Sequence, residues 1–522
     1  MRAYIIRKGV NDMAGIGFEL KKLFVHKGIL GNLKAYGVAG IVCTGPMMLG
    51  ILLLLVMRYI ASLGGASVAT QDALVAMITH TLIASLTISS IFLMVVTRYT
   101  ADMLYTNEPE KILPSFYGSS AILLIIGSLG YGTFLALTTA PLAYKALCYI
   151  LFCVLIVVWL QVSYITALKN YGRILLWFFI GVVVSILSGF LFIIAQINTI
   201  IALLCALIIG YGTIMSGFFV LMHRYFPKGQ GSPIAFLKWI SRYPSLLFMG
   251  VFMSVGAFGH LVIAWFGPYG RQAFGLFHDA PLYDVPAFIA FLSVIPTTIG
   301  FVTSLEANFY PKYKHYFFLY NNGGTLKDIE LAEMEMIQVL KKEIYYLAQK
   351  QFITTMLFII VGGFLLLPSS MILNETSLSI YRILCIGYGL YAIANSLFLI
   401  LLYFADNKGA FLTSLVFMLT GIISTIALSY VNNNYIGFGF LIGSFLMYLV
   451  AWLRMRYYLN SLQYHILCAQ PVGVTKTDGI FSVMNARTRI SEPQNGRAKH
   501  RRNSRAAIIQ HKTAGQIRIG ER

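Results

Sequence analysis

Twelve apolar segments of about twenty residues recur along the 522-residue chain and constrain its fold more than any other feature. They cover about 36–57, 74–97, 119–139, 146–167, 174–195, 198–222, 244–266, 284–304, 352–373, 381–404, 410–430 and 436–453. At ~1.5 Å of rise per residue, a helix of this length crosses the ~30 Å hydrocarbon core of a bilayer. With 58% hydrophobic and 11% charged residues, the chain has too little polar sequence to cover a soluble surface. The sequence therefore predicts an all-α polytopic membrane protein.

A polar, basic break divides these segments into two sets of six. The break, residues 223–243, is expected to be a cytoplasmic linker between a first half at 36–222 and a second half at 244–455. A segment with helically spaced apolar residues and lysines, residues 1–35, comes before the first half and is expected to be amphipathic. Two sets of six spans are typical of transporters that are built from two related halves.

Loop charge predicts the orientation in the membrane. Lys and Arg concentrate in every second loop, near 98–111, 169–173 and 224–242, while the alternate loops are mostly neutral. The exceptions are Arg58, Lys145, Arg271 and Arg382. Because basic loops stay on the cytoplasmic side, both termini are expected there.

The end of the chain, residues 456–522, is expected to be a basic, disordered cytoplasmic tail. From Pro471 onward it holds eleven Lys and Arg against three acidic residues, a net charge of +8 within a total of +20. It has few large apolar residues and no lasting periodicity. Its charge favours the anionic lipid leaflet, by ~1 kcal/mol per basic residue near the surface, and we expect no nucleic-acid partner.

The stretch Tyr283–Gln351, which lies past the middle of the chain, changes character along its length. Its apolar part ends near Ser304, and aromatic residues then alternate with Lys and His. After Gly323-Gly324 the apolar residues keep helical spacing; they are Ile329, Met334, Ile337, Leu340 and Ile344. The pattern predicts a span that ends in an aromatic belt and continues as a cytoplasmic helix on the membrane surface, at about 305–351.

Four short segments, in the same order, resemble one known family. They are MAGIGFELKKL from Met13, Thr44-Gly45-Pro46, YDVPAFIAFLSVIP from Tyr283 with the acidic helix after it, and YFADNKG from Tyr403. Together they cover about residues 13–470 and are similar to the PelG family, the polytopic membrane component of the bacterial Pel exopolysaccharide secretion apparatus. The resemblance implies a flippase-like fold of the superfamily (MATE/MOP type) that includes drug/cation antiporters and lipid-linked oligosaccharide flippases.

The resemblance also implies a substrate and partners. In that family the polymer is rich in N-acetylhexosamine, partly deacetylated and cationic. A cytoplasmic glycosyltransferase, PelF, is its implied source, and PelD and PelE are implied membrane partners. The surface helix at 326–351 and the linker at 224–242 are the expected docking surfaces. The implied location is the bacterial inner membrane.

No enzymatic motif is found in the sequence. GxxxxGK[ST], HExxH and a DxD-type acidic pair on a cytoplasmic loop are absent. Five of the six cysteines lie in apolar runs, without a CxxC pair, and are expected to be small core residues. We therefore expect no catalytic residue, no cofactor and no metal, and a protein that is not an enzyme.

Ionisable residues in or beside the apolar segments are few, and each is a candidate for the transport path. A charge at the bilayer centre costs at least ~2.5 kcal/mol, so such groups are usually functional. The candidates are His80 in the second segment, His260 in the seventh, and Asp284 and Glu306 at the two ends of the eighth. The alternative for the histidines is hydrogen-bonded packing, and the alternative for Glu306 is an ion pair with Lys312 or Lys314.

His260 departs from the pattern of the family. PelG relatives carry an acidic residue in this region, whereas this chain reads GAFGHL from Gly256 to Leu261. A carboxylate there could couple transport to a cation or contact a cationic sugar, while a histidine titrates near neutrality. The departure puts a coupling role carried over from the family in doubt.

Prolines predict kinks in two spans. Gly45 and Pro46 interrupt the first span and Pro296 the eighth. A proline removes one backbone hydrogen bond and bends the helix. Such kinks suit a transporter whose halves rock against each other, and the alternative is static kinks accommodated by packing.

These observations favour transport of a Pel-like exopolysaccharide across the cytoplasmic membrane as part of a synthase–secretion complex. One alternative is a stand-alone flippase or antiporter for lipid-linked sugars or small molecules. The other is a membrane scaffold for the synthase that transports nothing.

Overall fold

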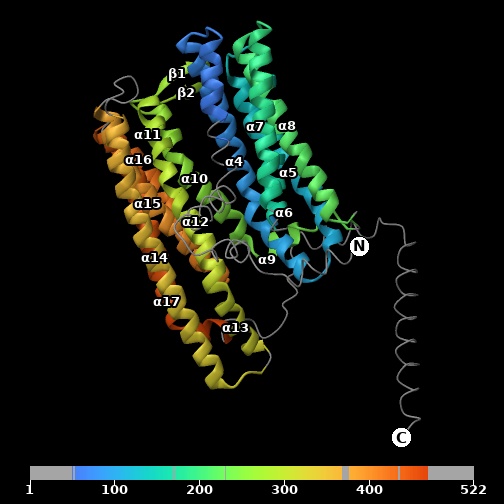
Figure 1. The fold of residues 1–522 in the computed structure, drawn as a ribbon, viewed down its shortest axis with the longest axis vertical. Coiled ribbons are helices and arrows are strands. Elements are labelled where there is room, and N and C mark those ends of the chain that lie inside the picture. The colour runs from blue at the N-terminus through green and yellow to red at the C-terminus, as the bar shows by residue number, and fades with distance from the viewer. Residues whose placement is uncertain are drawn as a thin grey trace, which may run out of the picture.

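The computed structural model describes residues 50, 53–167, 171–227, 229, 231–321, 323–366, 375–432 and 435–467. Most of them lie in long helices that run side by side along the molecule (Figure 1). The predicted amphipathic segment 1–35, the kink candidates Gly45 and Pro46, and the tail beyond residue 467 lie outside these ranges.

The helices follow one another in two groups. The first comprises the apolar helix Leu53–Leu63, α4 (Val68–Tyr105), η1 (Pro109–Lys111), α5 (Ile112–Leu137), α6 (Leu142–Thr166), α7 (Tyr171–Ile194) and α8 (Thr199–Tyr225). The short helix α9 (Leu237–Arg242) leads to the second group. This group comprises α10 (Pro244–Phe266), β1 (Arg271–Phe274), β2 (Phe277–Asp279), α11 (Pro281–Phe291), η2 (Leu292–Val294), α12 (Ile295–Ser304), η3 (Leu305–Phe309), α13 (Tyr310–Asn321), α14 (Leu326–Leu366), α15 (Glu375–Tyr403), α16 (Asn407–Val431), α17 (Ile436–Asn460) and α18 (Leu462–Leu467).

Within the described ranges, eleven helical segments are long and apolar enough to cross a membrane. They match, in order, the second to the twelfth predicted segment, while most of the first, 36–57, lies outside the description. The predicted class, an all-α polytopic membrane protein, is confirmed. In the described part of the chain, the antiparallel hairpin of β1 and β2 is the β-structure among these helices.

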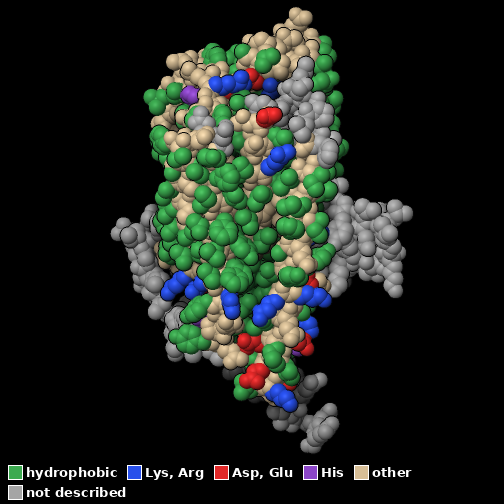
Figure 2. All heavy atoms as spheres, turned by 90° about the vertical axis from the view of Figure 1, so that its left-hand side faces the viewer, with side chains coloured by type: hydrophobic (Ala, Val, Ile, Leu, Met, Phe, Trp, Pro, Cys, Tyr) green, Lys and Arg blue, Asp and Glu red, His purple; other side chains and the backbone are tan. Residues whose placement is uncertain are grey.

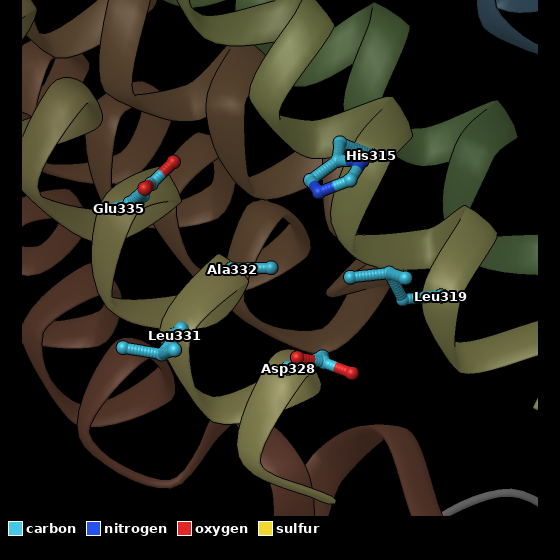
Figure 3. A pocket seen from close by; sticks show the side chains of 6 residues that line it. All are labelled: His315, Leu319, Asp328, Leu331, Ala332 and Glu335. Atoms are coloured by element: carbon cyan, nitrogen blue, oxygen red, sulfur yellow. The ribbon is translucent and has the colours of Figure 1, made fainter. Parts of the chain in front are cut away.

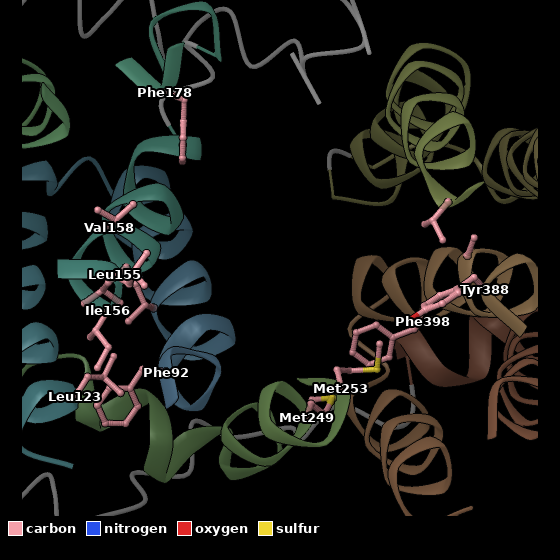
Figure 4. Close-up of a cluster of buried hydrophobic side chains, with 14 of the residues drawn as sticks. Phe92, Leu123, Leu155, Ile156, Val158, Phe178, Met249, Met253, Tyr388 and Phe398 are labelled. Atoms are coloured by element: carbon pink, nitrogen blue, oxygen red, sulfur yellow. The ribbon is translucent and has the colours of Figure 1, made fainter. Parts of the chain in front are cut away.

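Each group of helices packs around buried apolar side chains of its own. In the first group α6 packs on α4, α5 and α8; in the second α17 packs on α15 and α16, and α10 on α16. Figure 4 shows part of both cores, with Phe92, Leu123 and Leu155 in the first and Tyr388 and Phe398 in the second. The groups meet where α10 lies against α4. We call them the first half and the second half.

α14 differs from its prediction. It is one helix of 41 residues, about 60 Å long at ~1.5 Å per residue. It joins most of the predicted surface helix to the next apolar segment without a break, because no Gly or Pro stands between Tyr345 and Met356 to end it. The continuity of this helix was not expected from the sequence, and the placement of its first part on the membrane surface stays a prediction. Its acidic end extends, with α13, beyond the other helices (Figure 1).

The eighth predicted span is a series of short helices. Pro296 lies in the first turn of α12, directly after the 3₁₀ turn η2. Proline has no backbone N–H to offer the carbonyl of Leu292, and that carbonyl instead accepts a bond from the N–H of Ile295. The helix therefore tightens at the position where the kink was predicted.

The surface has the charge distribution of a membrane protein. On the face shown in Figure 2, apolar side chains form a broad band, with Lys and Arg gathered at its lower edge. Above the band, basic and acidic side chains lie together. Such a band is typical of a surface that faces lipid.

Candidate functional site

The β1–β2 hairpin belongs to the second half but lies on the first. Phe277 is 1% exposed and its ring meets those of His80 on α4 and Phe134 on α5, each with 5.4 Å between centroids. The backbone N–H of Leu276 donates to Oγ1 of Thr138 at 3.0 Å. The two halves are therefore joined at this end by a plug of apolar rings and a hydrogen bond.

The turn of the hairpin requires a glycine. Gly275 has a φ of +57°, which L-residues rarely adopt, and a Cβ there would lie 2.4 Å from Oγ1 of Thr138. The close approach of the two halves depends on this missing side chain.

His80 lies directly under the plug. Its ring stacks on Trp265 of α10 at 4.1 Å, and its Nδ1 donates to the carbonyl of Ala76 at 2.9 Å. The indole N–H of Trp265 in turn donates to both carboxylate oxygens of Asp284 on α11, at 3.1 and 3.0 Å. Trp265 therefore links two of the predicted site residues, one from each half.

His260 lies deeper, inside the second half. It is 2% exposed, and its ring nitrogens are hydrogen-bonded to the hydroxyls of Tyr283 at 2.8 Å and Tyr388 at 3.2 Å. Its ring also packs on Phe440, 4.4 Å away. Both nitrogens have partners, as the packing alternative requires. The neighbour of Tyr283 in the chain is Asp284, so the structure brings His80, His260 and Asp284 into one region of α4, α10 and α11.

Glu306 is not part of this group. It lies in the π-helical turn η3, between α12 and α13. Lys312, one of its two predicted partners, pairs with Glu335 of α14, with 2.6 Å between Nζ and Oε2.

A network of four charges, which was not predicted from the sequence, lies beside the plug. Asp72 on α4 accepts from Nη2 of Arg58 at 3.0 Å through Oδ1, and from Nη2 of Arg271 at 2.6 Å through Oδ2. Arg271 also donates from Nε to Oδ1 of Asp279 at 2.8 Å and from Nη2 to Oδ2 at 3.0 Å. We call these four residues the charge network.

The surroundings of Arg271 favour its charged form. The side chains of Asp72 and Asp279 are 9% and 10% exposed, whereas that of Arg271 is 50% exposed. The hydrogen bond to Asp279, together with the charges of both carboxylates, raises the pKa of Arg271 above its usual value. A signal was available in the sequence, because Arg58 and Arg271 are two of the four exceptions to the loop-charge pattern.

Below the plug, the halves meet through small side chains. Ser254 of α10 donates to Oγ1 of Thr87 on α4 at 3.3 Å. One turn along, a Cβ on Gly250 would lie 2.1 Å from the carbonyl oxygen of Ser90, so the two backbones touch there. Small residues permit such close helix contacts in membranes. The interface between the halves thus combines a plug, a charge network and a close helix pair.

A second polar cluster lies within the second half. Glu343 of α14, 9% exposed, accepts hydrogen bonds from Ser304 and from Nδ2 of Asn308, the latter at 2.9 Å. Two turns along, Gln351 bonds to Thr297 of α12 and to Thr355. These bonds join α14 to the broken span. Among the described residues, no group of three or more His, Cys, Asp or Glu could hold a metal ion.

Solved structures with a similar fold are transporters. A multidrug resistance MATE family transporter of the MOP superfamily, in an outward-facing conformation, matches with a TM-score of 0.56 at 12% identity, over 81% of this chain and 96% of that chain. A MATE structure in the straight conformation gives 0.54 at 13% identity, over 82% and 96%. A MOP superfamily transporter from Pyrococcus furiosus gives 0.52 at 13% identity, over 81% and 96%. At these identities the likeness establishes the fold, that of an all-helical, multi-pass membrane protein of the MATE/MOP type.

The sequence defines the family more narrowly. The profile of PelG, a family of exopolysaccharide exporters (EPS-E), matches residues 13–467. The chain belongs to the PelG family, and the resemblance seen in the sequence is confirmed. No curated protein matches the chain.

Proposed function

We propose that this protein moves a Pel-like exopolysaccharide, rich in N-acetylhexosamine and partly deacetylated, across the bacterial cytoplasmic membrane. Membership of an exporter family and the fold of the MATE/MOP transporters support a transport role. The observation that carries the proposal is the interface between the halves. Its plug and charge network lie at one end of the molecule, where a separation of the halves would open a path.

The proposed orientation places both termini in the cytoplasm and the hairpin on the outer side. Among the described residues, Arg58, Lys145, Arg271 and Arg382 are the basic residues near the hairpin end, and the charge network neutralises two of them. The linker helix α9 and the α13–α14 pair, both with basic residues, lie at the other end (Figure 1). This asymmetry follows the rule that basic loops stay inside.

In the same proposal, the protein works in a complex with the glycosyltransferase PelF and the membrane partners PelD and PelE. The projecting ends of α13 and α14 are the proposed surface for the glycosyltransferase, together with the linker 224–242. Leu326, Leu331 and Met334 are 70%, 48% and 54% exposed there. A cavity of about 370 Å³ lies between the two helices; its lining, shown in Figure 3, consists of His315, Leu319, Asp328, Leu331, Ala332 and Glu335.

Co-purification tests this surface. Leu331→Asp places a charge in the exposed apolar patch and is expected to abolish recovery of the glycosyltransferase with the tagged protein. Gln338→Asp adds the same charge to an exposed position of the same helix and is expected to leave recovery unchanged. Equal recovery with both variants would remove the surface from the proposal.

The location of the polymer tests the function. In a strain that lacks this protein but expresses the glycosyltransferase, we expect hexosamine polymer to disappear from the medium and to remain inside spheroplasts. Polymer absent from both places would favour the scaffold alternative or an obligate synthase–transporter. Polymer still in the medium would contradict export of a Pel-like polymer by this protein and favour the stand-alone flippase or antiporter.

A further inference from the structure

We propose that the charge network is an exchange lock, in which each half keeps an ion pair of its own when the halves separate. The proposal rests on the proposed function in one respect, that the two halves part at the hairpin end during transport. What it adds to the proposed function is a separate role for each of the ion pairs in the charge network. One ion pair crosses between the halves and holds them together, and the other two make its rupture easy.

The geometry assigns each pair to a side. Arg58 and Asp72 both belong to the first half, on the helix Leu53–Leu63 and on α4. Arg271 and Asp279 face each other across the hairpin, as register partners of β1 and β2, and belong to the second half. Within the charge network, only the contact between Arg271 and Asp72 joins the two halves.

The crossing pair can break without disturbing the others. Asp72 binds Arg58 through Oδ1 and Arg271 through Oδ2, so the loss of Arg271 leaves the first bond intact. Arg271 holds Asp279 with Nε and Nη2, and these two bonds stay within the hairpin. Separation therefore leaves neither carboxylate without a cation.

This arrangement matters because both carboxylates are about nine-tenths buried. A buried charge that loses its only partner is strongly destabilising, whereas a pair that remains neutral is not. A simple salt bridge across the interface would leave an isolated charge on each side when it opened. The lock avoids this penalty, so the apolar plug around Phe277 can set the strength of closure.

The lock makes an unusual prediction about Arg58, whose ion pair with Asp72 lies within the first half. If Arg58 only supported Asp72 in the closed state, its removal would loosen the interface. In the exchange lock, Arg58 neutralises Asp72 in the open state. Its removal makes Asp72 depend on Arg271 alone, and the interface should open less often.

A cysteine in place of Thr138 would report on opening. Thr138 is 2% exposed and lies under the turn of the hairpin, where Leu276 contacts it. A maleimide can reach Thr138→Cys only when the hairpin lifts. The full chain in lipid nanodiscs is labelled, and the same chain without this substitution, which keeps its six native cysteines, gives the background rate.

Asp72→Asn breaks the crossing pair and is expected to speed labelling by about two- to fivefold, because the Arg271 side of this pair is half exposed and solvent weakens the attraction. Arg58→Gln is expected to slow labelling by about threefold or more. Asp279→Asn, which removes the partner of Arg271 within the hairpin, is expected to slow labelling as well. Arg58→Lys keeps the charge and should restore the parent rate.

Arg382→Gln is the matched control, because it removes an exposed positive charge at the same end without touching the network. Its labelling rate should equal that of the parent. Faster labelling with Arg58→Gln, or equal rates for Asp72→Asn and the parent, overturns the exchange lock. Labelling does not depend on the cargo, so altered labelling with normal polymer secretion would instead remove the proposed function and leave the lock.

Discussion

Two pairs of arginine and aspartate, at opposite ends of the second half, have similar distances and different surroundings. Arg454 of α17 donates two hydrogen bonds to Asp406, at 2.6 and 2.9 Å, while Arg271 donates a single hydrogen bond to Asp72 at 2.6 Å. Arg454 and Asp406 both belong to the second half. Arg271 and Asp72 belong to different halves.

The surroundings of Asp406 make its pair permanent. Its carboxylate also caps α16, accepting from the backbone N–H of Gly409 at 3.1 Å, and its side chain is 5% exposed. A Cβ on Gly409 would lie 2.2 Å from Oδ2 of Asp406, so the turn has no room for a side chain at this position. Asp406 and Gly409 belong to the segment YFADNKG, which resembles the family. This segment therefore builds a rigid corner.

The surroundings of Asp72 allow exchange. It has a second arginine within its own half, and its partner Arg271 has a second carboxylate within the hairpin. In the exchange lock, the chemistry of an ion pair does not decide whether the pair is static. The proposal assigns that role to whether each member keeps a partner after the pair breaks.

The largest effect should follow from breaking the rigid pair. Asp406→Ala removes the cap of α16 and leaves Arg454, whose side chain is 28% exposed, without its partner. We expect the folded protein to lose on the order of 3 kcal/mol, since both a buried pair and a helix cap are lost. The thermal midpoint in detergent should fall clearly, and expression should fall with it. Asp72→Asn provides the comparison and should leave the midpoint nearly unchanged; an equal drop in both would contradict the distinction.

The largest effect on opening should follow from Phe277→Ala, whose cost falls on the contact between the halves. The ring is 1% exposed and packs between His80 and Phe134 of the other half. Loss of a buried phenylalanine costs about 3 kcal/mol or more. Because this ring packs against the other half, the loss destabilises the closed arrangement of the two halves. Labelling of Thr138→Cys should become at least about tenfold faster, well beyond the effect of Asp72→Asn. Phe274→Ala, on the same hairpin but only partly buried, is the control, and equal acceleration by both would show that the plug is not what holds the halves.

The spans could be predicted from the sequence because long apolar runs must be helices in lipid. Pro296 was also informative, since the missing N–H acts within its own helix. The continuity of α14 was missed because a change from acidic to apolar composition suggested a boundary. Composition sets the environment of a helix and does not end it, and the residues around Gln351 contain no helix breaker.

The site could be predicted only in part. His80, His260 and Asp284 were selected because ionisable groups are rare in apolar segments. The sequence does not mark Trp265 and Tyr388 as their partners, because only the packing of helices brings these residues close. The hairpin was missed because strands of four and three residues carry no reliable alternation, and Phe277 is buried by the other half rather than by its own sheet.

The smallest expected effect is an absence of coupling between the pair Arg271–Asp72 and the pair Arg454–Asp406. Substitutions at distant sites without shared partners usually add to within about 0.5 kcal/mol, whereas members of one network do not. The double variant Asp72→Asn with Asp406→Asn should therefore show the labelling rate of the first and the thermal midpoint of the second. Arg58→Gln with Asp72→Asn should behave differently: without a charge on residue 72, the loss of Arg58 no longer slows opening, and the labelling rate should equal that of Asp72→Asn alone. The contrary result would be a coupling between Asp72→Asn and Asp406→Asn as strong as that between Arg58→Gln and Asp72→Asn. Closure at the hairpin would then depend on the corner at Asp406, and the molecule would not divide into a mobile interface and a rigid half.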